Sequence, residues 1–181
     1  MYWRPVYTKL QANKRRLFSQ ALVLSTDGFK VAALWCTLAG MTTRPKVLYA
    51  SEPNLDAAEF RRVLVESGLG VTRPIDDDVR LKAMLANADL VLTARLDAPS
   101  KPLIGLARGI TDFSWVCYIS ELAVCKSAQG LGIGKGLLDE ARRRLGPSVA
   151  MSLISVPDAV GFYERIGMTR MADAFWFGRE R

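Results

Sequence analysis

Gln129-Gly130-Leu131-Gly132-Ile133-Gly134 is the stretch of sequence that decides the fold. It lies between an apolar segment typical of a strand and an amphipathic segment with helical spacing. Glycines lack a Cβ atom, so the backbone can curl around an anion, and the first amides of a helix have no partner within it. The helix dipole adds partial positive charge at the same place. The stretch therefore predicts a phosphate-binding turn, to which Lys135 can add a full charge.

Two common phosphate-binding motifs do not fit this turn. A Walker A loop needs a glycine at position 129 and a hydroxyl residue after Lys135, but the chain has Gln129 and Gly136 there. A dinucleotide fingerprint that starts at Gly130 or Gly132 needs another glycine five residues later, and neither register supplies it. The alternative is a turn whose glycines serve backbone geometry alone.

Outward from the turn, the pattern predicts a β-αα-βββ-α-β-α-β order that begins near residue 46. Asp56 and Glu59 have the spacing of a capping box, and Gly146-Pro147 ends the helix that follows the turn. Periodicity and turn residues predict strands over 46–50, 90–96, 103–110, 115–124 and 149–156, helices over 54–67, 76–87, 132–145 and 157–166, and one or two final strands over 168–178.

These residues carry a family resemblance. The turn matches the Q/R-x-x-G-x-G/A motif of the GNAT superfamily of acyl-CoA-dependent N-acetyltransferases, and Leu122-Ala123-Val124 looks like that family's central strand. The segment from Ala159 to Met168 resembles the family's A-x-x-F/L-Y-x-x-x-G-F motif. The resemblance implies an α/β fold of the α+β type over residues 46–181. Its central sheet would be mixed, mostly antiparallel and flanked by helices, with a basic N-terminal extension, residues 1–45, before it.

The resemblance also implies the site. Acetyl-CoA would be the co-substrate, and Tyr163 would be the general acid that protonates or hydrogen-bonds the departing thiolate; the alternative for Tyr163 is packing beside Phe162. Main-chain groups of the central strand would pair with the pantetheine arm and polarise the thioester carbonyl, as an oxyanion hole does. The residues implied in cofactor binding are Leu122, Ala123, Val124, Gln129, Gly130, Leu131, Gly132, Ile133, Gly134 and Lys135. The family often has asparagine at the position of Val156, so one hydrogen bond to CoA is in doubt.

The attacking amine must lose a proton, and the chain contains no histidine. Glu121, on the strand that leads to the turn, is the first candidate for the general base, and Asp112 is the second. Asp112 could instead bind a cationic substrate, and either carboxylate could be an ordinary solvated or capping group. Phe113 and Trp115 are candidates for the substrate wall, as are Arg73 and Trp176; the aromatic residues could equally be core.

Charge is distributed unevenly along the 181 residues, whose net charge is +7. Residues 1–45 hold seven basic residues and one acidic residue, giving +6, so the remainder holds 18 basic and 17 acidic residues, giving +1. The near-neutral body argues against nucleic acid as the main partner. Residues 1–40 could be a targeting peptide, a basic arm or an extension without a role. A further hypothesis is that translation begins at Met41.

Other features narrow the class of protein. No apolar run reaches the roughly 18–20 residues of a membrane span, so we expect no membrane insertion. The simplest interpretation of the cysteines is reduced thiols in a cytoplasmic protein. Cys36, Cys117 and Cys125 fit no zinc motif, which predicts reduced thiols and no metal site. The pattern leaves a homodimer open.

The sequence therefore predicts an acyltransferase that moves an acetyl group from acetyl-CoA to a primary amine by direct attack on the thioester. The acceptor stays open among a small amine, an amino acid, a drug-like amine and a peptide N-terminus. Two alternatives belong to other classes: a non-catalytic acyl-CoA-binding or sensing module, and a nucleic-acid-binding protein led by its basic N-terminal segment.

Overall fold

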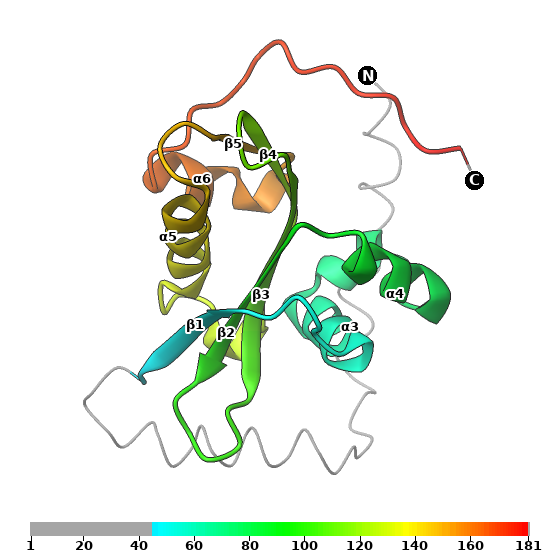
Figure 1. Cartoon of the computed structure of the whole chain (residues 1–181), viewed down its shortest axis with the longest axis vertical. Helices are drawn as coiled ribbons and strands as arrows, with labels where there is room; N and C mark the ends of the chain where they lie inside the picture. Colours follow the sequence, from blue (N-terminus) through cyan, green and yellow to red (C-terminus); the bar gives the residue numbers. More distant parts are fainter. Residues whose placement is uncertain (1–44, 181) are drawn as a thin grey trace, which may run out of the picture. The chain divides into compact units, whose positions relative to one another are not determined.

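One five-stranded sheet organises the computed structural model, which describes residues 45–180 (Figure 1). The strands follow chain order: β1 (Val47–Ser51), β2 (Leu90–Leu96), β3 (Leu103–Thr111), β4 (Val116–Val124) and β5 (Ala150–Leu153). Neighbours from β1 to β4 are antiparallel, whereas β4 and β5 are parallel. The predicted mixed, mostly antiparallel sheet of the α+β type is confirmed.

Helices cover both faces of this sheet. Figure 1 shows α3 (Ala57–Ser67) and α4 (Asp78–Ala86) on one side, and α5 (Ile133–Leu145) and α6 (Val160–Arg165) on the other. Short 3₁₀ turns, Leu69–Thr72, Lys126–Ala128 and Pro157–Ala159, link these elements. The inner faces of α3 and α4 pack on the sheet through a buried apolar cluster that includes Phe60, Leu64, Leu81, Leu106 and Ala123.

The helix boundaries follow local chemistry. Asp56 caps α3, because its Oδ1 accepts the amides of Ala58 and Glu59 at 2.8 and 3.1 Å. In a capping box the Glu59 carboxylate would bind back to the backbone amide of the N-cap residue. Here it accepts hydrogen bonds from Arg95 of β2 instead. Gly68 ends α3 in the left-handed conformation, with φ 86°.

The sheet has a bulge in β4 that the pattern of residues did not predict. Arg108 pairs with Glu121, but the next residue of β3, Gly109, pairs with Ile119, so Ser120 is an extra residue in β4. A bulge of this kind bends its strand and increases the local twist. Here it changes the course of β4 halfway along its length.

Two sequence predictions differ from the structure at the C-terminal side. β5 is shorter than the predicted 149–156, and no strand forms between residue 168 and residue 180 within the described chain, so the prediction of final strands is wrong. The aromatic residues near the end favour a strand, but a strand needs a paired edge, and this segment makes no ladder.

Some predictions lie outside the described residues: the basic extension before residue 45, the proposed start at Met41, and the state of Cys36. Residues Pro45–Arg181 form a compact unit by themselves. Cys117 and Cys125 are buried free thiols, which agrees with the prediction of reduced cysteines for these two positions. Between residues 45 and 180, no helix has both the length and the apolar character to cross a membrane.

Candidate functional site

The site begins where β4 and β5 separate. The two strands pair only from Val116 with Ala150 to Ile119 with Leu153, and β4 then continues alone to Val124. The separation coincides with the bulge at Ser120, so the bend carries β4 away from β5. One edge of β4 between residues 120 and 124 is therefore without a strand partner in the described chain.

Backbone groups of β4 face this opening. The amide of Cys125 donates to the carbonyl oxygen of Ile104 in β3 at 2.9 Å. Since successive residues of a strand direct these groups alternately to opposite sides, those of Leu122 and Val124 are directed away from β3. The Val124 carbonyl indeed accepts the side-chain amide of Gln129 at 3.0 Å. The backbone groups of Leu122 and the amide of Val124 are thus available for the predicted pantetheine contacts, whereas the Val124 carbonyl already accepts from Gln129 and Ala123 bonds toward β3.

The glycine turn follows directly, and two of its glycines are required by conformation. Gly130 has φ 81° and Gly132 has φ 82°, a region that other residues rarely adopt. A Cβ atom on either would meet nothing within 4 Å, so open space lies above the turn. Gly132 is the N-cap of α5, and no side chain caps the helix. The first amides of α5 are therefore free of side-chain competitors for an anion.

The third glycine of the turn serves packing. A Cβ atom on Gly134 would lie 3.2 Å from Cζ of Phe162, so the absence of a side chain lets the α6 ring rest on the start of α5. Tyr163 is the next residue of α6, and its ring lies edge-on to that of Phe162 with centroids 5.0 Å apart. This contact brings together the two sequence motifs of the site. Burial raises the pKa of the Tyr163 phenol above its usual value of 10.0.

The remaining residues of the turn contribute in different ways. Ile133 is buried in the core, so only its backbone can reach a ligand, while Leu131 is partly exposed. The Lys135 ammonium pairs with Asp139, one helical turn further along α5, at 2.5 Å. Lys135 therefore holds its charge beside α5 in this structure, and what the turn offers to an anion is its backbone amides.

Glu121 lies at the centre of a buried ionic cluster, with 1 % of its side chain exposed. Its Oε1 accepts from Arg73 Nε at 2.6 Å, and its Oε2 accepts from Arg108 Nε at 2.5 Å. The Ser120 hydroxyl also donates to Oε1 at 3.0 Å. Both carboxylate oxygens are thus occupied by charge-assisted hydrogen bonds. This geometry suits a structural anchor better than a group that must accept a proton from substrate.

The same cluster holds the bulge. Arg73 Nη2 donates to the backbone carbonyl of Ser120, the extra residue, at 2.7 Å. Arg108 Nη1 donates to the carbonyl of Met84 in α4 at 3.1 Å. Arg73, predicted as a substrate-wall residue, instead connects the segment after α3 to the bend in β4. Sequence reasoning missed this cluster because its members are separated by up to 48 residues.

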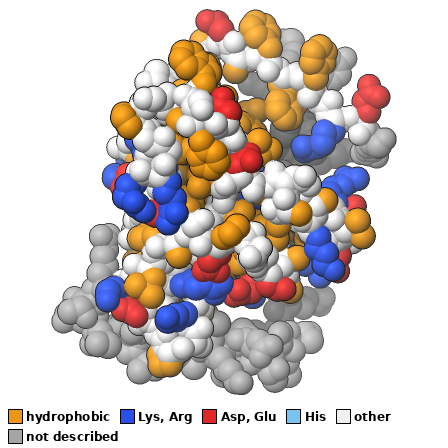
Figure 2. All heavy atoms as spheres, in the orientation of Figure 1, with side chains coloured by type: hydrophobic (Ala, Val, Ile, Leu, Met, Phe, Trp, Pro, Cys, Tyr) orange, Lys and Arg blue, Asp and Glu red, His pale blue; other side chains and the backbone are white. Residues whose placement is uncertain are grey.

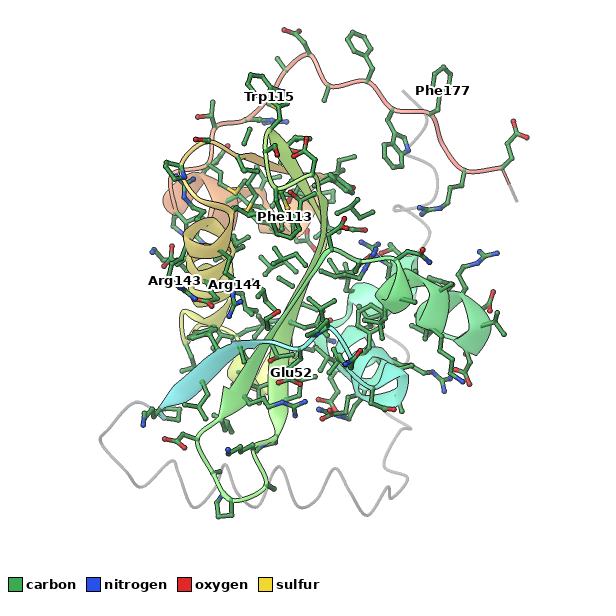
Figure 3. The ribbon with its side chains drawn as sticks, viewed as in Figure 1. Glu52, Phe113, Trp115, Arg143, Arg144 and Phe177 are labelled. Carbon is green, nitrogen blue, oxygen red and sulfur yellow. The ribbon has the colours of Figure 1, made fainter. Side chains whose placement is uncertain are left out.

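The loop between β3 and β4 contains the weaker substrate candidates. Asp112 Oδ1 accepts the amides of Ser114, Trp115 and Val116 at 2.9, 2.8 and 3.1 Å, which lowers the pKa of its carboxyl group. Phe113 adopts φ 54°, in the left-handed region. The Asp112 carboxylate therefore shapes the turn. Phe113 and Trp115 are exposed, and Figure 3 shows Trp115 at the tip of this hairpin.

Comparison with known proteins identifies the family of the chain. The family model described as "Acetyltransferase (GNAT) domain" matches residues 74–177. An uncharacterized N-acetyltransferase, ycf52, of Pyropia yezoensis is 28% identical over 189 residues, covering 99% of each chain. The ycf52 protein of Porphyra purpurea is 24% identical over 140 residues, covering 74% of this chain and 78% of its own length.

Solved structures share the fold. A GNAT-family acetyltransferase from Streptococcus pneumoniae superimposes with a TM-score of 0.55 at 19% identity, covering 75% of this chain and 100% of its own. An aminoglycoside N-acetyltransferase in complex with CoA gives a TM-score of 0.58 at 14% identity, covering 78% of this chain and 99% of its own. At these identities the likeness concerns the fold alone.

Proposed function

Because the chain belongs to the GNAT acetyltransferase family and is an acyltransferase, we propose that it transfers an acetyl group from acetyl-CoA to a primary amine by direct attack of the amine on the thioester. One observation carries the proposal. The unpaired end of β4 is followed, after one short 3₁₀ turn, by the glycine turn at Gly130 and Gly132. A ligand whose extended pantetheine arm joins a pyrophosphate to a thioester matches an unpaired strand edge that is followed by a helix N-terminus.

The residues present fit this co-substrate. Gly130 and Gly132 hold a left-handed backbone under open space, so the amides from Gly130 to Lys135 can surround a pyrophosphate without a side chain in the way. The outward-directed groups of Leu122 and Val124 can pair with the amide groups of the pantetheine arm. Acetyl-CoA supplies the activated acetyl group, and an amide of β4 that donates to its carbonyl oxygen would stabilise the charge that develops there during attack.

Tyr163 is proposed to donate a proton or a hydrogen bond to the CoA sulfur as it leaves. Burial raises the pKa of the phenol, so the side chain stays protonated at neutral pH, which is the form that a donor needs. The Phe162–Gly134 contact fixes α6 on α5, and this contact keeps Tyr163 beside the turn. This contact between α5 and α6 supports the assignment of Tyr163 as the general acid.

We propose that Glu121 acts by holding the bulge in place. Its two guanidinium partners occupy both oxygens, and the Arg73 contact to Ser120 ties the cluster to the strand bend. General-base action by Glu121 is the competing hypothesis. The pH dependence of turnover separates the two roles, because only a base would make the acid limb of the profile depend on this carboxyl group.

The test of the proposed function is a CoA-release assay on the full chain with acetyl-CoA and a panel of small primary amines, amino acids and peptide N-termini. Amine-dependent release of CoA, with mass spectrometry showing the acetylated amine, is the expected result. Tight acetyl-CoA binding without release across the whole panel would instead indicate a non-catalytic acyl-CoA-binding module. Activity is expected to persist in a chelator, since the proposed chemistry uses no metal.

A further inference from the structure

The first turn of α5 lies between two aromatic rings. Phe162 of α6 rests on Gly134, and a second ring, that of Tyr49 in β1, rests on Gly136. A Cβ atom on Gly136 would overlap the hydroxyl group and Cζ of Tyr49, and it would lie 2.9 Å from Cε1. Residues two positions apart in an α-helix lie on nearly opposite sides of it. The two rings therefore contact the start of α5 from opposite sides.

Gly136 also closes the first helical hydrogen bond of α5. Its amide donates to the carbonyl oxygen of Gly132, the N-cap residue, at 3.0 Å. The amides of Ile133, Gly134 and Lys135, which come before it, have no partner inside the helix. These are among the groups that the proposed pyrophosphate site needs. A ring in contact with Gly136 therefore determines where these amides lie relative to the sheet.

The Tyr49 ring is the firmer of the two supports. Every residue of β1 pairs with β2, so the backbone of Tyr49 is fixed in the sheet. Phe162, by contrast, lies on α6, a helix of only 6 residues. Partial burial and the negative charge of Asp139 raise the pKa of the Tyr49 phenol, so the ring stays uncharged beside the turn at neutral pH.

Charged side chains of α5 do not replace correctly placed amides. The three arginines of the helix, residues 142–144, occupy its last turn, and Figure 2 shows Lys and Arg side chains gathered over α5. At the first turn, the Lys135 ammonium is paired with Asp139. Binding of an anion at the start of α5 therefore depends on the position of the backbone amides.

We propose that Tyr49 is a positioning residue for the co-substrate, and that its contact with Gly136 fixes the first turn of α5 so that the free amides meet the CoA pyrophosphate. The inference rests on the proposed function, and it extends the site to β1, at the opposite edge of the sheet from β5. It also gives a role to Gly136, because only a residue without a side chain lets the ring approach so closely.

Calorimetric titration of acetyl-CoA into the full chain tests the contact with Tyr49→Ala, Gly136→Ala and the double variant. Alanine favours a helix interior more than glycine does, so Gly136→Ala should not weaken α5 by itself. Either the ring or the turn must give way, however, and in both cases the amides lose their support. We expect each single variant to bind acetyl-CoA about fivefold or more weakly, and the double variant to bind like Tyr49→Ala, because the two residues act through one contact.

The matched control is Leu48→Ala, the neighbouring residue of β1. Successive side chains of a strand point to opposite faces of the sheet, so this truncation leaves the contact with α5 in place. Leu48→Ala should therefore bind acetyl-CoA as the wild type does. Wild-type affinity in both Tyr49→Ala and Gly136→Ala would overturn the proposal, as would additive losses in the double variant.

A ligand without the pyrophosphate separates positioning of the turn from a general effect on the fold. S-acetylpantetheine keeps the pantetheine arm and the thioester, and NMR titration measures its binding even when it is weak. Tyr49→Ala and Gly136→Ala should leave the affinity for S-acetylpantetheine unchanged, and an equal loss for both ligands would overturn the positioning role. A wild type that binds neither ligand would remove the proposed function itself and the positioning role with it.

Discussion

Arg108 of β3 and Glu121 of β4 are directly paired in the sheet register, and Arg108 Nε donates to Glu121 Oε2 at 2.5 Å. The register shifts immediately beyond this pair, where Ser120 is the extra residue of β4. Arg73 binds both the other Glu121 oxygen and the Ser120 carbonyl. A buried ionic cluster therefore sits at the point where β4 leaves β5, and it links the fold to the opening in which we place the pantetheine arm.

Removing the Glu121 carboxylate should damage both stability and cofactor binding. Glu121→Ala leaves two guanidinium groups without their buried partner, a change that typically costs about 3–5 kcal/mol of unfolding free energy. Glu121→Gln keeps the shape and one acceptor oxygen, so we expect a smaller loss of stability and a raised KM for acetyl-CoA. Denaturant unfolding and steady-state kinetics measure these effects, with the exposed Glu164→Gln as control.

The pH profile of Glu121→Gln decides between anchoring and proton transfer. If Glu121 anchors the bulge, kcat falls by a similar factor at every pH and the profile keeps its shape. Disappearance of the acid limb, with the turnover of wild type and variant converging at low pH, where the wild-type base is itself protonated, would instead assign the proton transfer to this carboxylate.

The contact between Gly134 of α5 and Phe162 of α6 should affect kcat by setting the position of α6, and it should leave the conformation of the glycine turn unchanged. Gly134→Ala would place a Cβ atom 3.2 Å from the Phe162 ring, so α6 and Tyr163 must move by a fraction of an ångström. We expect kcat to fall severalfold. Phe162→Leu in the same chain should restore part of the loss, because it makes room for the methyl group. Additive effects in this double-mutant cycle would contradict coupling through the contact.

Tyr163→Phe should reduce turnover while leaving the fold intact. General acid catalysis typically contributes 10²-fold or more, so we expect kcat to fall by about 10² with little change in acetyl-CoA affinity. Since the pKa of the phenol is raised above 10.0, the wild-type protein should lose activity from deprotonation of Tyr163 only above pH 10. Equal kcat values for Tyr163→Phe and the wild type would remove Tyr163 from the mechanism.

Asp112 should make stability depend on pH at the acid end. Three backbone amides lower the pKa of its carboxyl group in the folded state, so the ionised form stabilises the β3–β4 turn at neutral pH. This contribution is fully present above the ordinary aspartate pKa of about 3.9 and is lost as the pH falls through the lowered value. Thermal melts of Asp112→Asn and wild type should therefore differ at pH 7, and the difference should shrink as the pH falls below the ordinary aspartate pKa. A difference that is constant with pH would contradict this account.

Local signals in the sequence predicted most of the fold. Asp56 caps its helix as its spacing indicates, β2 spans the predicted Leu90–Leu96, and α5 ends at Gly146. Each of these features depends on side chains within a few residues of one another. The turn at Gly130 and Gly132 is also predictable from local sequence, because glycine is the residue that most readily adopts its left-handed backbone conformation.

Features that depend on distant partners were not predictable in this way. The bulge at Ser120 arises from a register between two strands and from Arg73, which approaches from the segment after α3. Glu121 therefore resembles a free catalytic carboxylate in the sequence, although in the fold it is enclosed by guanidinium groups. The last segment has the composition of a strand, but composition does not determine whether a segment lies along a sheet edge, and this one pairs with none in the described chain.

The central claim is that the glycine turn binds acetyl-CoA through its backbone, and calorimetry on Gly132→Ala and Gly146→Ala tests it most directly. Both glycines have positive φ, 82° and 78°, both have open space around a Cβ atom, and they lie at opposite ends of α5. We predict that the wild type and Gly146→Ala bind acetyl-CoA in preference to ATP, and that Gly132→Ala weakens this binding at least tenfold. Equal affinities in both variants, or equal binding of ATP and acetyl-CoA by the wild type, would contradict the account.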